Sequence, residues 1–231
     1  MTRTVDDARR ELETAVTTGF PLTYSPQTAA PADGSVRRSA VLLLFGALDR
    51  VPAAPNGTVE VAAELDVLLT RRADHLRHHP GQIAFPGGGV EPGDADDAAT
   101  ALREAAEETG LDPGGIDVLG ALPAIHLPVS NNLVTPVVGW WRLPSPVAAD
   151  RSESVEVFRV PVAELVRPSA RGTSVLRSGR QTFRGAAFQL GPQFGGHVVW
   201  GFTGMLLSSV LAGVGWEEPW DPRREFPVTR G

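Results

Sequence analysis

Three glutamates follow a glycine-rich loop at a short and regular spacing. Glu104, Glu107 and Glu108 stand shortly after the run FPGGG, residues 85–89. Residues three and four apart lie on one face of a helix, so these carboxylates would fall within an arc of roughly 100°. Such a face suits a hard divalent cation, which prefers oxygen ligands, and glycines let the backbone approach a ligand closely. A solvated acidic face without a metal is the alternative that the spacing leaves open.

The helix that carries the glutamates is expected to begin near Asp94 or Asp96, because either residue can serve as its N-cap. Gly110 is its natural C-terminal stop. Arg103 lies four residues before Glu107 and can offset part of the repulsion between the carboxylates. We expect the glutamates to point together, away from the core. The opposite face would pack on a sheet through Ala98, Ala99, Leu102, Ala105 and Ala106.

This segment resembles the Nudix box, in which Gly, five residues, Glu and seven residues precede Arg-Glu-apolar-any-Glu-Glu-any-Gly-apolar. All fixed positions but one are filled, by Gly89, Arg103, Glu104, Ala105, Glu107, Glu108, Gly110 and Leu111. The exception is the upstream glutamate, where this chain has Ala95 with Asp94 beside it. The resemblance implies a hydrolase that cleaves a diphosphate linked to a nucleoside. It also implies a single α/β (α+β) domain, a Nudix-type α/β/α sandwich with a mixed sheet.

A second segment, residues 68–88, is similar to the signature of the coenzyme A pyrophosphatase branch of Nudix hydrolases. The sequence LLTRRADHLRHHPGQIAFPGG fills every fixed place of that signature, including Arg72 and Arg77. In that branch an aspartate one place early, as Asp94 is here, is also usual. The resemblance implies hydrolysis of coenzyme A to 3′,5′-ADP and 4′-phosphopantetheine. ADP-ribose, NADH or a nucleoside triphosphate as substrate, and a non-catalytic nucleotide-binding module, remain alternatives.

The resemblance also implies roles for the acidic residues. Glu104 and Glu108 would be the primary ligands of Mg²⁺ or Mn²⁺, with Glu107 as a third ligand or support, and Arg103 would orient a glutamate. A divalent metal neutralises a diphosphate and lowers the pKa of a bound water. Positioning and charge stabilisation then do most of the catalysis. Glu104, Glu107 or an external carboxylate would take the proton of that water. Glu153 is the external candidate, and an exposed charge at a strand edge is its equal alternative.

Arginines and glycines are the expected contacts to the substrate, a small nucleotide diphosphate. Arg72 and Arg77 could hold its phosphates, because guanidinium groups pair well with phosphate oxygens. They could equally solvate a strand end or pair with Asp74. The glycines expected at the substrate are Gly87, Gly88 and Gly89.

Hydrophobic runs and turn residues predict the elements that must position these groups, with a mixed α/β sandwich as the result. A helix is expected at 5–18 and a helical turn at 163–166; strands at 39–48, 64–72, 81–85, 116–125, 133–143 and 154–162; a possible hairpin at 182–190; and a strand followed by a helix at 197–211.

The chain is expected to divide into three parts. These are an N-terminal helix and loop (1–36), the Nudix domain (37–213, box 89–111) and a C-terminal tail (214–231). The chain from Trp216 is expected to be loose or wrapped on the surface.

Composition excludes several classes of function. The net charge of -6 argues against nucleic-acid binding, which needs a basic surface, and the absence of cysteine excludes disulfides and thiolate metal sites. The N-terminus is charged and lacks the apolar core of a signal peptide. The uncharged stretch 198–215 contains four glycines and two serines, so a buried strand and helix is expected there rather than a membrane span. We expect a cytoplasmic protein, and the resemblance adds a weak expectation of a homodimer.

Overall fold

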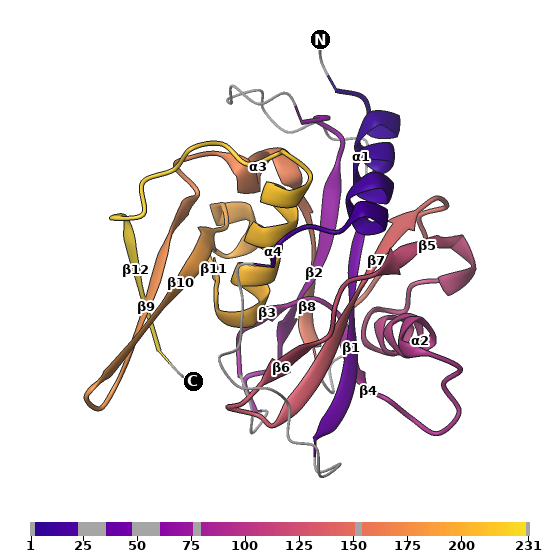
Figure 1. Ribbon diagram of the computed structural model, residues 1–231, viewed down its shortest axis with the longest axis horizontal. Helices are drawn as coiled ribbons and strands as arrows, with labels where there is room; N and C mark the ends of the chain where they lie inside the picture. The colour runs from indigo at the N-terminus through magenta and orange to yellow at the C-terminus, as the bar shows by residue number, and fades with distance from the viewer. Residues whose placement is uncertain (1–2, 23–35, 48–60, 76–79, 151–153, 230–231) are drawn as a thin grey trace.

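The structure, a computed structural model, describes residues 3–22, 36–47, 61–75, 80–150 and 154–229 (Figure 1). Its larger sheet has eight strands in the order β3-β2-β1-β7-β5, with β4 beside β1, β6 beside β7 and β8 beside β2. The strands are β1 (Arg37–Gly46), β2 (Asp66–Arg72), β3 (Ile83–Ala84), β4 (Gly87–Gly89), β5 (Ile116–Ala121), β6 (Ile125–Leu127), β7 (Asn132–Trp141) and β8 (Ser154–Pro161). Since β1 and β7 run parallel and the other pairs antiparallel, the predicted mixed sheet is confirmed.

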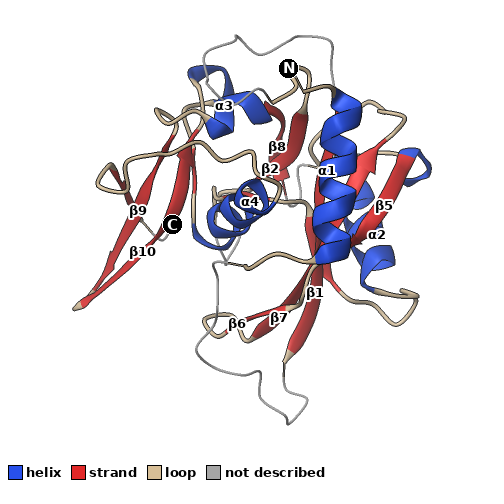
Figure 2. Cartoon of the chain, turned by 45° about the horizontal axis from the view of Figure 1, so that its top comes forward, coloured by secondary structure: helices blue, strands red, loops and turns tan. Residues whose placement is uncertain are grey.

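Helices cover both faces of this sheet. They are α1 (Val5–Thr18), α2 (Asp97–Thr109), α3 (Val162–Val166) and α4 (Gly201–Gly213). Residues of α1 and α4 belong to one hydrophobic cluster and those of α2 to another. The two clusters lie on opposite faces of the large sheet, with α1 and α4 in front of it in Figure 2. The α/β/α sandwich expected from the sequence is therefore confirmed.

The strand β1 shows why its sequence is apolar without interruption. Successive side chains of a strand point to opposite faces. Leu42 and Leu44 belong to the cluster beneath α2, whereas Leu43 and Phe45 belong to the cluster beneath α1 and α4. Since both faces are covered by helices, both sets of side chains are buried and the strand has no polar alternation.

A second sheet of four strands lies beside the first, in the order β11-β10-β9-β12. Its strands are β9 (Arg171–Ser178), β10 (Gln181–Gln189), β11 (Val198–Val199) and β12 (Glu225–Val228). The expected hairpin within 182–190 is wrong, because this segment is one strand, and the turn of the hairpin lies before it at Gly179, which has a positive φ. The strand followed by a helix in 197–211 is confirmed by β11 and α4. No helix of the described chain is long and apolar enough to span a membrane.

The sequence predicted that the segment from Trp216 is loose or wrapped on the surface, and the structure shows that it is ordered. Trp216 is fully buried against Phe45, with ring centroids 6.1 Å apart, and its indole N–H donates to Glu11 of α1. Glu217 pairs with the buried Arg171 at 2.7 Å, and β12 adds to the second sheet in parallel with β9. This proline-rich segment is ordered for two reasons. Trp216 buries a large apolar area, and β12 pairs with the edge of β9, which would otherwise lack a partner.

Replacement of Trp216 by alanine is expected to lower the free energy of unfolding by about 3–5 kcal/mol, because it removes a fully buried aromatic side chain. Urea unfolding followed by circular dichroism measures the change. Val129→Ala is the control, since 77% of that residue is exposed and a change within about 0.5 kcal/mol is expected. Equal stability of the two variants would show that the tail does not contribute to the core.

Candidate functional site

The helix α2 begins and ends at residues that the sequence marks. Asp96 is the N-cap, and its carboxylate accepts the backbone N–H of Ala99. Gly110 closes the helix in the left-handed conformation, with φ of 69°, and its N–H donates to the carbonyl of Ala106. Of the two predicted starts, the structure therefore selects Asp96, which leaves Asp94 in the preceding loop for another role.

The three glutamates do not point together away from the core, so that prediction is wrong. Glu108 is buried, with 4% of its surface exposed, whereas 59% of the Glu107 side chain is exposed. The physical reason is the position of Glu108, three residues after Ala105 and seven after Ala101, both of which pack on the sheet. Glu104 lies between these extremes, with 14% of its side chain exposed.

The buried glutamate faces the free edge of strand β4. One edge of β4 pairs with β1, where Gly88 lies opposite Ala40. On the other edge, the N–H of Gly87 donates to Oε2 of Glu108 at 3.4 Å, and the carbonyl of Gly89 accepts Nη2 of Arg103 at 2.8 Å. Side chains of α2 thus satisfy backbone groups that a neighbouring strand would otherwise pair.

Close approach explains the glycines of β4. A Cβ at Gly88 would lie 2.3 Å from Oε2 of Glu104, and one at Gly87 would lie 2.3 Å from the carbonyl oxygen of Ala40. Neither distance is compatible with a side chain, so Gly87 permits the contact with β1 and Gly88 leaves room for the Glu104 carboxylate. At Gly89 the corresponding space is open. Two of the three predicted substrate-binding glycines therefore have a structural reason of their own.

Arg103 connects the acidic groups of the site. Its Nε and Nη2 donate to the two carboxylate oxygens of Asp94, both at 3.0 Å, in the two-bond geometry that guanidinium and carboxylate favour. Its Nη1 donates to Glu104 at 3.0 Å and to Glu107 at 3.2 Å. One cation thus offsets the repulsion among three carboxylates and fixes two of the predicted metal-binding side chains.

Asp94 is held from three sides, although it is not part of the helix. Besides Arg103, its Oδ2 accepts the hydroxyl of Thr100 and the backbone N–H of Glu91, each at 2.8 Å. The hydrogen bonds from Arg103, followed by the one from the Glu91 backbone, hold the pKa of the Asp94 carboxyl well below its usual range. Asp94 therefore supplies a carboxylate that supports Arg103, next to the position where Ala95 departs from the box.

The donor set fits a divalent cation through two carboxylates rather than three. Within the part of the chain that the structure describes, no group of three histidine, aspartate or glutamate side chains could hold a metal ion. Glu104 and Glu108, however, reach the adjacent residues Gly88 and Gly87 of β4. Mg²⁺ is commonly bound by one or two carboxylates, with substrate phosphates and water completing its shell. Glu104 and Glu108 can supply such a pair, while Glu107 turns toward Arg103 and solvent.

Of the remaining predicted charged residues, the structure describes only Arg72. Arg77 and Glu153 lie outside the described residues. Arg72 stands at the end of β2, and its buried Nε has no hydrogen-bond partner in the described part of the chain. Asp74 pairs with Arg71 instead, through bonds of 2.7 and 2.9 Å, so the expected Arg72–Asp74 alternative is wrong.

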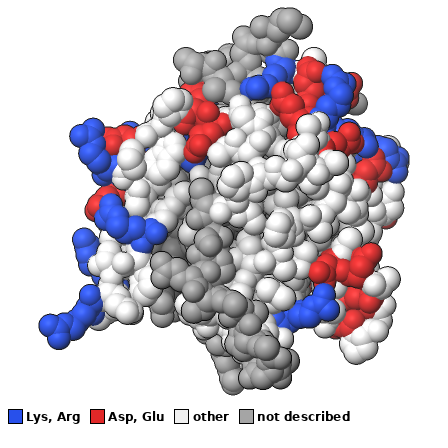
Figure 3. All heavy atoms as spheres, viewed as in Figure 1, with Lys and Arg blue, Asp and Glu red and all other residues white. Residues whose placement is uncertain are grey.

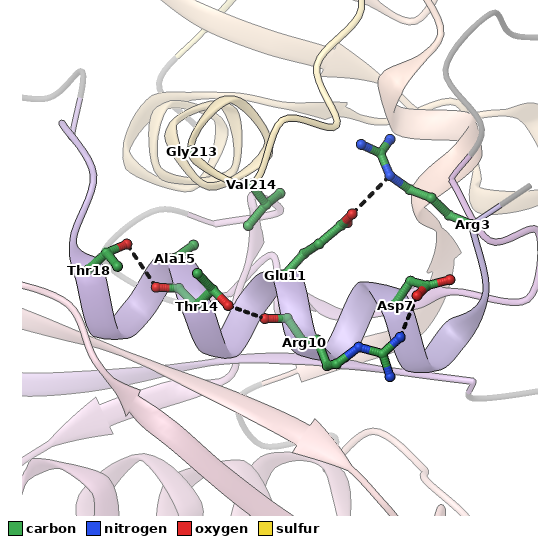
Figure 4. A pocket seen from close by; sticks show the side chains of 9 residues that line it. All are labelled: Arg3, Asp7, Arg10, Glu11, Thr14, Ala15, Thr18, Gly213 and Val214. Atoms are coloured by element: carbon green, nitrogen blue, oxygen red, sulfur yellow. Dashed lines mark hydrogen bonds and ion pairs between the residues drawn. The ribbon is translucent and has the colours of Figure 1, made fainter. Parts of the chain in front are cut away.

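The charges elsewhere on the surface are mixed. Figure 3 shows basic and acidic side chains side by side around the rim of one face, without a continuous basic surface among the described atoms of that view. A hollow of about 390 Å³ lies between α1 and the end of α4 (Figure 4). Four of its charged side chains form ion pairs, Arg3 with Glu11 and Arg10 with Asp7. These two pairs carry no net charge that would attract a charged ligand.

The chain is similar to a known protein family and to several of its members. The family model described as the NUDIX domain matches residues 56–176, more than half of the chain. A Cronobacter sakazakii protein named "Uncharacterized Nudix hydrolase NudL" is 47% identical over 104 residues, which are 45% of this chain and 54% of that protein. The Escherichia coli K12 protein of the same name is 46% identical over 98 residues, 42% of this chain and 50% of that protein. The chain spans about half the length of these curated relatives.

Among solved structures, the M. smegmatis Nudix hydrolase RenU matches with a TM-score of 0.40 and 24% identity. The match covers 54% of this chain and 70% of that one.

The Asp94–Arg103 contact predicts a pH-dependent contribution to stability. Because the pKa of Asp94 is lowered on folding, its contribution is present above the unfolded value of about 3.9 and is lost as the pH falls through the folded value. The stability advantage of the native chain over Asp94→Asn should be largest near neutral pH and shrink below about pH 4. Urea unfolding between pH 7 and 3 measures it. An advantage that stays constant over this range would contradict the assigned contact.

Proposed function

The chain belongs to the Nudix family, and we propose that it is a metal-dependent hydrolase of the diphosphate bond in coenzyme A or its derivatives. The products would be 3′,5′-ADP and 4′-phosphopantetheine. The observation that carries the hydrolase proposal is the convergence of Glu104 and Glu108 on neighbouring residues of β4, with Arg103 fixing Glu104. The similarity of residues 68–88 to the coenzyme A pyrophosphatase signature supports this substrate over other nucleotides.

Different residues of the chain would have different roles in the hydrolysis. Glu104 and Glu108 would hold Mg²⁺ or Mn²⁺, which neutralises diphosphate oxygens and lowers the pKa of a bound water. Arg103, fixed by Asp94, keeps the Glu104 carboxylate in place, so that the ligand does not have to be ordered when substrate binds. Glu104, Glu107 or Glu153 would accept the proton of the attacking water.

The proposed contacts to the substrate are charged arginine side chains and a glycine with open space beside it. Arg72, at the end of β2, and Arg77 would donate to phosphate oxygens. Gly89 has open space beside its Cα, so its backbone can approach a ligand. A cytoplasmic location and a homodimer remain predictions from the sequence and from the family resemblance.

The test is a substrate panel with Mg²⁺ and with Mn²⁺, in which the native chain should cleave coenzyme A in preference to ADP-ribose, NADH and a nucleoside triphosphate. Glu108→Gln should lower kcat/KM by about 100-fold or more, because it removes a charged ligand of the metal. Glu13→Gln is the matched control on the exposed side of α1 and should retain activity. Preference for another nucleotide would refute the substrate, and ligand binding without turnover would refute the enzyme.

A glycine pair tests the position of the Glu104 carboxylate. Gly88→Ala places a Cβ where Glu104 lies, so the flexible side chain must move and kcat/KM should fall by about 100-fold with little loss of stability. Gly93→Ala, in the following loop, meets no atom within 4 Å and should behave as the native chain. Steady-state kinetics and thermal unfolding of both variants measure the two effects. Full activity of Gly88→Ala would show that Glu104 is not needed at this position.

A further inference from the structure

A second hollow, of about 410 Å³, lies at the beginning of β1. The residues that line it are Arg37, Arg38, Ser39, Gly89, Val90 and Asn132. Strand pairing brings these three segments together, because Ser39 lies opposite Gly89 of β4 and Arg37 lies in register with Asn132 of β7. The hollow is therefore built by the sheet itself rather than by a single loop.

Successive side chains of β1 point to opposite faces of the sheet, so its polar side chains lie on both faces. Ala40 and Leu42 pack beneath α2, so Arg38 shares their face, and its guanidinium indeed pairs with Asp97 of α2 at 2.8 Å. Arg37 and Ser39 consequently belong to the opposite face. Asn132 joins them there, and its amide Nδ2 donates to the hydroxyl of Ser39 at 3.0 Å.

Arg37 is the group in the hollow that is best suited to bind an anion. Its Nη2 donates to the backbone carbonyl of Ser130 at 2.9 Å, a contact that orients the side chain without neutralising its charge. A guanidinium has five N–H donors, so this bond leaves others for a ligand. Arg38 differs, because the carboxylate of Asp97 offsets its charge. The planar donors of Arg37, beside the Ser39 hydroxyl and the Asn132 amide, match the oxygens of a phosphate.

The hollow and the glutamate pair share one wall, strand β4. Gly89 lines the hollow, and its carbonyl accepts Nη2 of Arg103, which in turn holds Glu104. Gly88, the preceding residue, faces the Glu104 carboxylate, and neighbouring Cα atoms are about 3.8 Å apart. A molecule that crosses β4 would contact both sites. A nucleotide that carries a diphosphate and a second phosphate on one ribose has two anionic groups, one for each site.

We infer that Arg37, with Ser39 and Asn132, forms a subsite for the 3′-phosphate of a nucleotide whose 5′-diphosphate lies against Glu104 and Glu108. The inference rests on the proposed function and specifies its substrate class. Preferred substrates carry a phosphomonoester in addition to the diphosphate, as coenzyme A does. Nucleotides that lack this group, such as ADP-ribose, leave the subsite without its anion and bind less tightly.

The kinetic test compares coenzyme A with dephospho-coenzyme A, which differs only in lacking the 3′-phosphate. Arg37→Gln should lower kcat/KM for coenzyme A by about 10- to 100-fold, mainly through KM, and leave dephospho-coenzyme A nearly unchanged. Arg184→Gln, an exposed arginine on β10, is the matched control and should alter neither. An equal loss for both substrates, or no loss for either, would overturn the subsite.

A binding measurement separates failure of the subsite from failure of the proposed function. Titration calorimetry with 3′,5′-ADP and with 5′-AMP requires no turnover. The native chain should bind 3′,5′-ADP more tightly, and Arg37→Gln should abolish most of this difference while it retains 5′-AMP binding. If neither coenzyme is cleaved but this difference is observed, the proposed reaction is refuted and the subsite stands. Equal binding of the two nucleotides by the native chain refutes the subsite, whatever is cleaved.

Discussion

The contacts of Arg103 are the interaction on which the rest of the site depends. A helix that presents several carboxylates at three- and four-residue spacing is destabilised by their repulsion. Arg103 places its guanidinium among Asp94, Glu104 and Glu107, and its contact with the Gly89 carbonyl attaches the same group to the sheet. One side chain thus stabilises the helix, fixes the preceding loop and orients the Glu104 carboxylate, a proposed metal ligand.

The edge of β4 joins stability to function in the same way. An unpaired strand edge exposes backbone donors and acceptors, which proteins usually cover. Here Glu108 accepts the N–H of Gly87, so its carboxylate gains a partner in a buried position that would otherwise be unfavourable. The contact also directs the carboxylate toward the strand that Glu104 approaches at Gly88. The same contacts thus cover the edge of β4 and bring together Glu104 and Glu108, the two proposed metal ligands.

Outside the site, a buried arginine secures the second sheet and the C-terminal segment. Arg171 is fully buried, pairs with Glu217, donates to Ser208 of α4 and stacks on Phe188 and Trp220. Burial lowers the pKa of its guanidinium, and the hydrogen bond and charge of Glu217 oppose this shift. Because these contacts link β9, β10, α4 and the tail, they support the helix that covers one face of the large sheet.

The sequence by itself determined the features that depend on local chemistry. The cap at Gly110, the strand β1 and the set of glutamates follow from capping preference, hydrophobic runs and motif spacing, all of which act within a few residues. The tertiary structure alone decided the burial of Glu108, the pairing of Asp94 with Arg103 and the pairing of the C-terminal strand β12 with β9. It also brought Arg37 beside Asn132, ninety-five residues later in the chain. These features depend on which segments the sheet places side by side, and helical or strand periodicity carries no information about partners so distant in sequence.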